Sequence, residues 1–158
     1  MKIAIGSDKS GFSAKEAIKA YLTEAGIEFD DLGTQDLDHV VPYYAVANKV
    51  APLVQNGTYD KAVLICGTGA GMRVVSNKFK GVYAVACEGV YSAKMARAIN
   101  NANILAMGGW IVGPEMAVEM VKTFLATEWC QDLEDWRKEN MKKFAVQVAA
   151  IEDEIYGK

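Results

Sequence analysis

The sequence contains a single histidine, three cysteines and three prolines among its 158 residues, and these scarcities exclude several kinds of protein. The cysteines (Cys66, Cys87 and Cys130) are odd in number, and their spacing matches neither a zinc motif nor a redox motif. His39 has no second histidine or cluster of carboxylates at ligand spacing, so we read it as an ordinary surface or capping group. We therefore predict neither a metal ion nor another cofactor.

A block of basic residues and a long apolar run are also missing. The formal net charge of −3 argues against a nucleic-acid-binding protein. Apolar runs stay well below the roughly 18 to 20 residues that cross a bilayer, so we expect no membrane association. Because no signal peptide is recognisable either, we expect a cytoplasmic protein, folded as a single domain over residues 1–158.

One stretch stands out among the features that are present. The branched apolar run Val63–Ile65 ends at Cys66, and glycines occupy alternate positions of the segment Gly67–Gly71. Glycines allow a sharp turn and a close approach to a ligand, and the first amides of a following helix point outward. A helix N-terminus also favours a cysteine thiolate, and Thr68 adds a hydroxyl. The pattern predicts either a cradle for an oxygen-rich substrate or a tight turn beside an inert cysteine.

Short apolar strands alternate with amphipathic helices along the chain. We expect strands, in chain order, over residues 2–6, 27–32, 63–66, 82–86 and 104–107. We expect helices over residues 13–25, 43–54, 70–80, 90–100, 114–125 and 133–156. This alternation predicts an α/β fold, a three-layer Rossmann-like domain in which a five-stranded parallel sheet lies between helices.

Local signals add detail to three of the helices. Ser13 and Glu16 have the spacing of a capping box, which predicts a helix beginning at Ser13. Pro52 predicts a break in the helix over residues 43–54. The last helix repeats apolar residues such as Trp136 and Phe144 at helical spacing, and no later segment could pack on it. We expect it to clasp a second subunit; the alternative is that it folds back on its own sheet.

The predicted topology also predicts where a site would lie. Ligands bind outside the carboxyl ends of the strands in open parallel sheets. That rule brings Asp8, Cys66, Cys87–Glu88 and Gly108–Trp110 to one edge of the sheet.

Short motifs occur along the chain in a specific order. They are Ile3–Asp8, Gly11–Phe12, Asp31–Thr34, Pro42, Tyr44–Ala45, Cys66–Met72, Asn77–Lys78, Tyr91–Ala93, Asn100–Asn103, Gly108–Gly109 and Gly113–Glu115. In this order the chain resembles the ribose-5-phosphate isomerase B and galactose-6-phosphate isomerase family over most of its length. The resemblance implies an aldose–ketose isomerase that works without metal. It also implies a homodimer or a dimer of dimers, with active sites at the subunit boundary.

The resemblance further implies roles for individual residues. Cys66 would be the base that moves a proton between the first two carbons, and Thr68 would assist proton transfer between the oxygens. Backbone amides of the glycine segment would stabilise the enediolate. Such chemistry independently needs a base of tuned pKa and donors aimed at the developing oxyanion. The matched positions that would contact substrate are Asp8, Gly67, Gly69, Gly71 and Asn100.

Four positions depart from the family pattern. Lys9 stands where the family usually has a histidine, and Ile99 replaces the ring-opening histidine. Trp110 replaces the arginine of a Gly-Gly-Arg motif, and Arg137 alone remains of a C-terminal arginine pair. The isomerisation group is therefore kept, while the ring-opening and phosphate-binding groups are changed.

These departures leave several substrates open. A tetrose or tetrulose 4-phosphate cannot close a ring, so Ile99 would be harmless, and Lys9, Arg73 and Arg137 would bind the phosphate. A pentose 5-phosphate is also ring-blocked in its ketose form. An unphosphorylated sugar could instead pack on the ring of Trp110, unless that residue belongs to an interface.

A non-catalytic sugar-binding subunit of a paired isomerase is the alternative from another functional class. The presence of both Cys66 and Thr68 argues against it.

Overall fold

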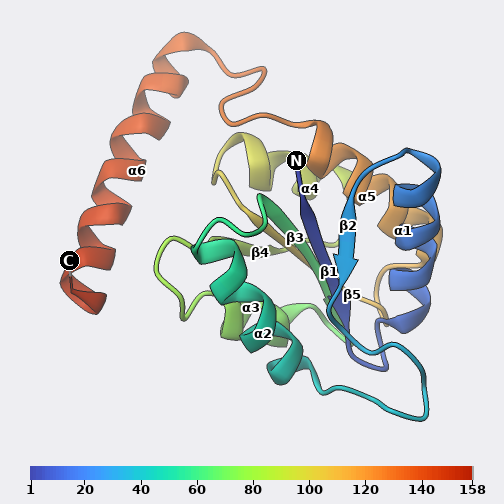
Figure 1. Cartoon of the computed structure of the whole chain (residues 1–158). Coiled ribbons are helices and arrows are strands. Elements are labelled where there is room, and N and C mark those ends of the chain that lie inside the picture. The colour runs from blue at the N-terminus through green and yellow to red at the C-terminus, as the bar shows by residue number, and fades with distance from the viewer. Residues whose placement is uncertain (158) are drawn as a thin grey trace.

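Five parallel strands form one sheet in the order β2-β1-β3-β5-β4 in the computed structural model, which describes residues 1–157 (Figure 1). The strands are β1 (Ile3–Ser7), β2 (Phe29–Asp31), β3 (Lys61–Cys66), β4 (Ala84–Ala86) and β5 (Ile104–Gly108). All residues of the three central strands are buried, as their continuous apolar sequence predicts. The predicted five-stranded parallel sheet is confirmed.

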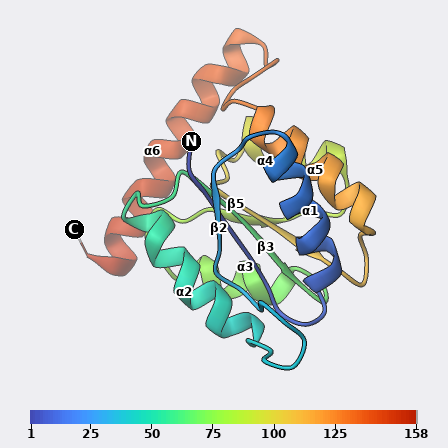
Figure 2. The same cartoon turned by 45° about the vertical axis from the view of Figure 1, so that its right-hand side comes forward.

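Helices cover both faces of this sheet (Figures 1 and 2). Two separate apolar cores show the division: Ile3 and Ile5 of β1 face one core, and Ala4 faces the other. The helices of the first core are α1 (Phe12–Glu24), α4 (Val90–Ala98) and α5 (Pro114–Ala126). Those of the second core are α2 (Tyr43–Gln55) and α3 (Ala70–Ser76). The predicted three-layer Rossmann-like architecture is therefore confirmed.

The predicted capping box at the start of α1 is wrong. The helix begins at Phe12, its N-cap residue is Gly11, and Ser13 lies inside the first turn. A Cβ atom on Gly11 would come within 2.5 Å of the Ile65 side chain, so close packing on β3 fixes where the helix starts. Glu16 instead forms ion pairs with neighbouring lysines of the same helix.

The predicted break at Pro52 is also wrong, because α2 continues to Gln55. Its buried residues, which include Val50, Ala51 and Val54, pack against the sheet and hold the helix together around the proline. The two edge strands, β2 and β4, are each three residues long and so shorter than the apolar patterns predict. An edge strand has a neighbour on one side only, which limits the pairing that defines its length.

The last helix, α6 (Asp135–Tyr156), lies beside the domain body and outside its three layers (Figures 1 and 2). None of its described residues is buried. Near its C-terminal end the Glu152 carboxylate accepts hydrogen bonds from the Gly81 amide at 2.9 Å and the Tyr83 hydroxyl at 3.0 Å. The Lys80 ammonium lies 2.6 Å from an Asp153 oxygen. The helix is thus tied to its own domain at one end, but its apolar face is left exposed.

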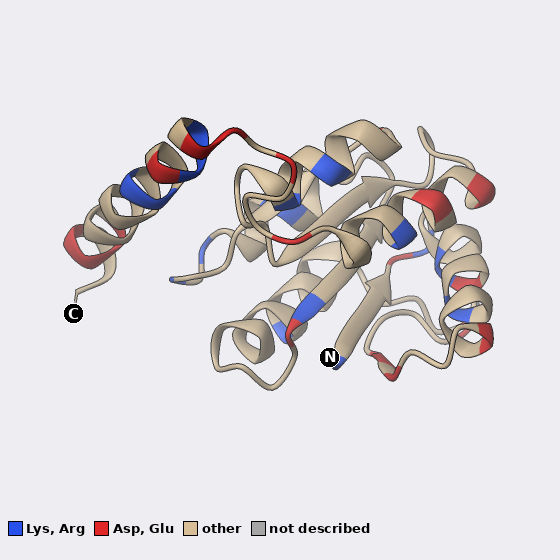
Figure 3. Ribbon diagram, turned by 90° about the horizontal axis from the view of Figure 1, so that it is seen from above, with Lys and Arg blue, Asp and Glu red and all other residues tan. Residues whose placement is uncertain are grey.

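Positions of both basic and acidic residues occur along α6, and both also occur on the helices of the domain body (Figure 3). Within the described part of the chain, every helix is too short or too polar to span a membrane.

Candidate active site

The carboxyl ends of the three central strands meet at one edge of the sheet. Register pairs Ser7 with Ile65 and Cys66 with Gly108. Beyond the strands, the Asp8 amide donates to the Ile65 carbonyl at 3.2 Å, and the Gly109 amide donates to the Cys66 carbonyl at 2.8 Å. The predicted placement of Asp8, Cys66 and Gly108 along one edge is confirmed.

Cys66 lies at the end of β3 and is only 4% exposed. Its sulfur accepts a hydrogen bond from the backbone amide of Gly69 at 3.2 Å. Gly69 has a φ of +77°, and a Cβ atom there would come within 2.9 Å of the Met107 carbonyl carbon. Both observations require glycine, because only glycine combines a left-handed conformation with so close an approach. The turn therefore aims a donor at the sulfur, and such a donor bonds more strongly to a thiolate than to a thiol.

The segment Gly67–Gly71, which we call the glycine loop, leads from Cys66 into α3. The exposed Thr68 lies on this loop, and its hydroxyl oxygen accepts a hydrogen bond from the Ala70 amide at 3.3 Å. The first amides of α3 find no acceptor inside the helix, because the carbonyls that would pair with them precede its start. The Cys66 thiol, the Thr68 hydroxyl and the unpaired amides at the start of α3 thus lie close together in sequence around this loop.

Two aromatic side chains lie against the ends of the glycine loop. A Cβ atom on Gly67 would come within 2.8 Å of the indole ring of Trp110, and one on Gly71 within 2.6 Å of the Tyr43 ring. Trp110 is 75% exposed and Tyr43 is 40% exposed, so both rings also face outward. Sequence reasoning selected Trp110 but missed Tyr43, since its only local signal is a position after Pro42 at the start of a helix.

Asp8 borders the loop on the β1 side. Its Oδ1 atom accepts hydrogen bonds from the amides of Ser10 at 2.8 Å and Gly11 at 3.2 Å. Burial raises the pKa of the Asp8 carboxyl above its ordinary value, and these two hydrogen bonds act in the opposite direction. One oxygen suffices for the turn, so the other can accept a hydrogen bond from a substrate hydroxyl.

Two predicted cations lie near these groups. Lys9 directly follows Asp8 and is exposed, and Arg73 is exposed on α3, two residues beyond the glycine loop. Their long side chains supply positive charge at the same edge of the sheet as Cys66.

Two other predicted residues do not reach Cys66 within one chain. Asn100 follows α4, which runs from the carboxyl end of β4 toward the amino end of β5, so it lies at the opposite edge. It lines a groove of about 710 Å³ between α6 and the domain body, together with Ile99. Arg137 lies on α6, where its guanidinium is 3.5 Å from Glu134. Ile99, Asn100 and Arg137 of one chain therefore lie away from the Cys66 of the same chain.

Comparison with known proteins identifies the family. Residues 3–142 match the family model described as Ribose/Galactose Isomerase. The chain belongs to the ribose/galactose isomerase family. The resemblance predicted from the motifs is confirmed, and so is the enzyme class: the chain is an aldose–ketose isomerase that acts on a small sugar or sugar phosphate.

Several members of the ribose/galactose isomerase family resemble this chain. The 4-deoxy-4-sulfo-D-erythrose isomerase of Clostridium sp. (strain MSTE9) is 51% identical and covers 100% of this chain and 99% of its own length. The D-erythrulose-4-phosphate isomerase of Pectobacterium atrosepticum is 36% identical and covers 82% of this chain and 85% of its own.

Solved structures of ribose-5-phosphate isomerase B have the same fold. That of Clostridium thermocellum has a TM-score of 0.87 and 35% identity, covering 98% of this chain and 99% of the other. The Mycoplasma genitalium enzyme with bound ribulose-5-phosphate has a TM-score of 0.86 and 28% identity, with 97% of each chain covered.

The structure also shows the surroundings of the other cysteines and of the histidine. Cys87, at the end of β4, and Cys130 are both buried, and burial raises the pKa of the Cys87 thiol. His39 is exposed, and its Nδ1 atom lies 2.9 Å from an Asp36 oxygen, which fits the predicted surface group. Among residues 1–157, histidine, cysteine and acidic side chains form no cluster of three that could hold a metal ion.

Proposed function

We propose that this isomerase interconverts a four-carbon aldose and ketose that carry a terminal sulfonate, 4-deoxy-4-sulfoerythrose and 4-deoxy-4-sulfoerythrulose. The observation that carries the proposal is the 51% identity to a 4-deoxy-4-sulfo-D-erythrose isomerase, which extends over 100% of this chain. The D-erythrulose-4-phosphate isomerase named above matches a smaller share of this chain, 82%, at a lower identity of 36%.

The carbon skeleton of this substrate explains Ile99. A 4-deoxy-4-sulfo sugar has no hydroxyl on its fourth carbon, so it cannot close a five-membered ring and needs no ring-opening acid. Ile99 cannot transfer a proton, and it stands where the family resemblance expects a ring-opening histidine. The proposal therefore retains the four-carbon length, one of the alternatives that the sequence left open, and replaces the phosphate by a sulfonate.

The charges near the loop also suit a sulfonate. A sulfonate carries one negative charge, whereas a phosphate monoester carries about −1.5 to −2 near neutral pH. Lys9 and Arg73 lie exposed at this edge, and Trp110 occupies the position at which the resemblance expects an arginine. A singly charged group needs fewer cations, and the indole ring can pack on the carbon chain of the substrate.

The residues around the glycine loop support an enediolate mechanism. The thiolate of Cys66 removes the proton from the second carbon, and the electron pair moves onto the oxygen of the first carbon. Amides of the glycine loop then stabilise the charged enediolate, as donors fixed in a partly buried site do most effectively. The Cys66 thiol returns the proton to the first carbon, while Thr68 passes the hydroxyl proton from the second oxygen to the first. The product is the ketose, and every proton is conserved.

A second copy of the chain would complete this site. Asn100 and Arg137 are matched to substrate contacts but lie away from Cys66 in one chain, and the described residues of α6 leave an apolar face exposed. Pairing two copies through α6 would cover that face and bring these side chains to the partner's glycine loop. The proposed assembly is accordingly a homodimer, or a dimer of dimers, with shared sites.

The base and the substrate can be tested with one set of proteins. Cys66→Ala should abolish exchange of the substrate C–H proton with solvent deuterium, followed by NMR, while binding of the sulfonate sugar survives. Wild-type kcat/KM should be highest for the four-carbon sulfonate within a panel of tetrose, pentose and hexose sugars with and without phosphate. Unchanged deuterium exchange in Cys66→Ala would overturn the role of Cys66 as the base. A higher kcat/KM for any phosphorylated sugar would overturn the proposal that the substrate carries a sulfonate.

Shared sites can be tested by mixing inactive chains. Cys66→Ala and Asn100→Ala chains, each inactive alone, should regain up to about a quarter of wild-type activity after mixed refolding, because half of the dimers contain one intact site. A mixture as inactive as its components, with mixed dimers verified by mass spectrometry, would show that the sites are not shared.

A further inference from the structure

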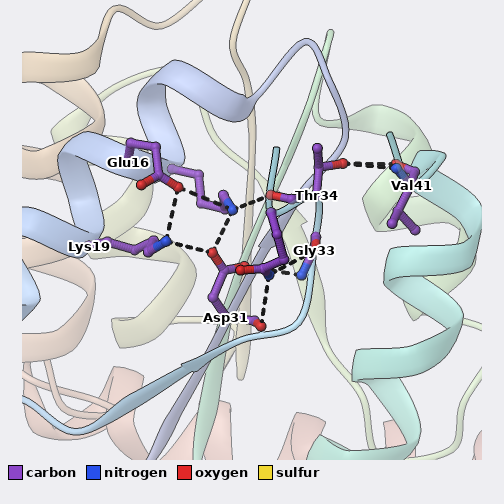
Figure 4. A network of polar contacts seen from close by, with 8 residues as sticks. Glu16, Lys19, Asp31, Gly33, Thr34 and Val41 are labelled. Carbon is purple, nitrogen blue, oxygen red and sulfur yellow. Dashed lines mark hydrogen bonds and ion pairs between the residues drawn. The ribbon is translucent and has the colours of Figure 1, made fainter. Parts of the chain in front are cut away.

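Lys15 is completely buried, with an exposed fraction of 0%, although it belongs to the surface helix α1. Its ammonium donates to an Asp31 oxygen at 2.5 Å and to the Thr34 carbonyl, and it lies 3.2 Å from Glu16 (Figure 4). Burying a lysine is unfavourable unless its charge is paired and its donors are satisfied. The partners of Lys15 meet this condition: Asp31 is the last residue of β2, Thr34 belongs to the segment that follows this strand, and Glu16 is the next residue of α1.

Asp31 forms the centre of this network. Its Oδ2 atom also lies 2.9 Å from the Lys19 ammonium, and its Oδ1 atom accepts a hydrogen bond from the Gly33 amide at 3.1 Å. Burial alone would raise the pKa of Asp31, but the hydrogen bonds from Lys15, Lys19 and Gly33 outweigh it and lower the pKa. Asp31 is thus a carboxylate that fixes the chain where β2 ends.

Thr34 extends the network to the far end of a loop. It is fully buried, and its amide donates to the Ser7 carbonyl at 2.9 Å. Its hydroxyl accepts from the Val41 amide at 3.0 Å and lies 3.3 Å from the Val41 carbonyl (Figure 4). These contacts close the base of the loop over residues 34–41, whose residues 35–40 are all exposed.

The closed loop leads directly to the glycine loop of the active site. Pro42 follows Val41 and caps α2, and Tyr43 is the first residue of that helix. The Tyr43 ring lies where a side chain on Gly71 would stand, with 2.6 Å between that Cβ position and the ring. A continuous series of contacts therefore connects Lys15, on one face of the sheet, with the glycine loop.

We propose that Lys15 is a positioning residue for the isomerisation: by holding Thr34 and the loop over residues 34–41, it keeps Tyr43 against Gly71. The inference rests on the proposed role of the glycine-loop amides in stabilising the enediolate. The Tyr43 ring keeps water from one side of Gly71, and amide donors act more strongly where water is excluded. A small displacement of the ring changes the direction of these donors, although Lys15 never touches the substrate.

The test is a double-mutant cycle between the two ends of the series. Thr34→Val removes the contacts to Val41 with little change in volume, Lys15→Met removes the buried charge, and Tyr43→Leu removes the ring. Each single variant should lower kcat/KM by about tenfold or more, as small misplacements of reacting groups do, chiefly through kcat. In the Tyr43→Leu background, Thr34→Val and Lys15→Met should have little further effect.

Lys61→Met is the matched control for losing a buried lysine. Lys61 is 8% exposed, and its ammonium donates to the Leu125 carbonyl at 3.4 Å, remote from the loop. It should lower the melting temperature and leave kcat/KM close to wild type when activity is measured well below that temperature. If Lys15→Met does not fold, Thr34→Val carries the test alone.

The outcomes separate this inference from the proposed function. Additive effects of the paired variants, or unchanged kcat/KM in folded Thr34→Val, would overturn the positioning role while Cys66→Ala remains inactive. Active Cys66→Ala would instead overturn the proposed site itself.

Discussion

The indole ring of Trp110 occupies the space in which a side chain at Gly67 would stand. A Cβ atom on Gly67 would lie 2.8 Å from two ring carbons, and the Trp110 amide donates to the Gly67 carbonyl at 3.1 Å. The ring thus packs on the residue that directly follows Cys66. The residue at position 110 should therefore influence whether the enzyme prefers a substrate with a terminal sulfonate or one with a terminal phosphate.

Trp110→Arg should shift the enzyme toward phosphate substrates. The new guanidinium would bind a doubly charged phosphate bidentately, which tryptophan cannot do. We expect the ratio of kcat/KM for erythrose 4-phosphate to that for the sulfonate sugar to rise by about tenfold, since one charge-assisted contact contributes about 1.5 to 3 kcal/mol. Steady-state kinetics with both substrates provide the measurement, and Trp110→Leu is the uncharged control. An equal rise of the ratio in Trp110→Leu would show that the ring excludes phosphate by its bulk.

Gly67→Ala should lower activity with little loss of stability, whereas Gly108→Ala should lower stability markedly. An alanine at Gly67 meets the exposed Trp110 ring, which can move, so the loss of stability should stay below about 1 kcal/mol while activity falls. An alanine at Gly108 meets backbone atoms of Gly67 and Thr68 at 2.7 to 2.8 Å, and these cannot move without displacing the loop. We expect the unfolding free energy of Gly108→Ala, measured by chemical denaturation, to fall by about 2 to 3 kcal/mol. Equal losses of stability would contradict the difference between a mobile ring and a fixed backbone.

Stability in acid should depend on Asp31. Its folded pKa lies below the ordinary value of 3.8, so the stability that it contributes is present above that pH and is lost as pH falls through the folded pKa. Asp31→Asn should flatten the fall in unfolding free energy below about pH 4. Asp31→Asn should also lower the unfolding free energy at pH 7 by about 3 kcal/mol, because it removes the carboxylate that pairs with the buried Lys15.

Urea denaturation between pH 2.5 and pH 7 would measure both effects. Asp38→Asn is the control, because Asp38 is solvent-exposed on the loop over residues 34–41 and exposed carboxylates contribute little to stability. An acid transition of Asp31→Asn that matches wild type would contradict the prediction.

Glu152 should control the direction of α6. Its carboxylate holds the Gly81 amide and the Tyr83 hydroxyl, and burial together with this carboxylate raises the pKa of Tyr83 to about 12. If two copies pair through α6 as proposed, Glu152→Ala should weaken this association by about tenfold, because the helix loses the contacts that set its orientation. Sedimentation equilibrium would measure the dissociation constant, with Glu154→Ala as a control on the same helix. Equal association of both variants would show that the orientation of α6 is set elsewhere.

Local sequence signals determined the architecture and the chemistry. Apolar strands alternating with amphipathic helices led to the parallel sheet, because such strands need crossover helices. Cys66 could be selected because a strand end, a thiol and three glycines are adjacent in sequence. The same local order of motifs identified the family, and with it the enzyme class.

The helix start, the packing around the glycine loop and the buried lysine depend on contacts between segments that are distant in sequence. The start of α1 depends on how closely Gly11 approaches β3, and the place of Tyr43 depends on Gly71, 28 positions further along the sequence. The burial of Lys15 could not be foreseen, because Asp31 and Thr34 come from the end of another strand and the segment after it. The sequence by itself determined the family, the enzyme class and the groups proposed to perform the chemistry, whereas the tertiary structure decided which residues pack around them, since close contacts between distant residues leave no periodic pattern along the chain.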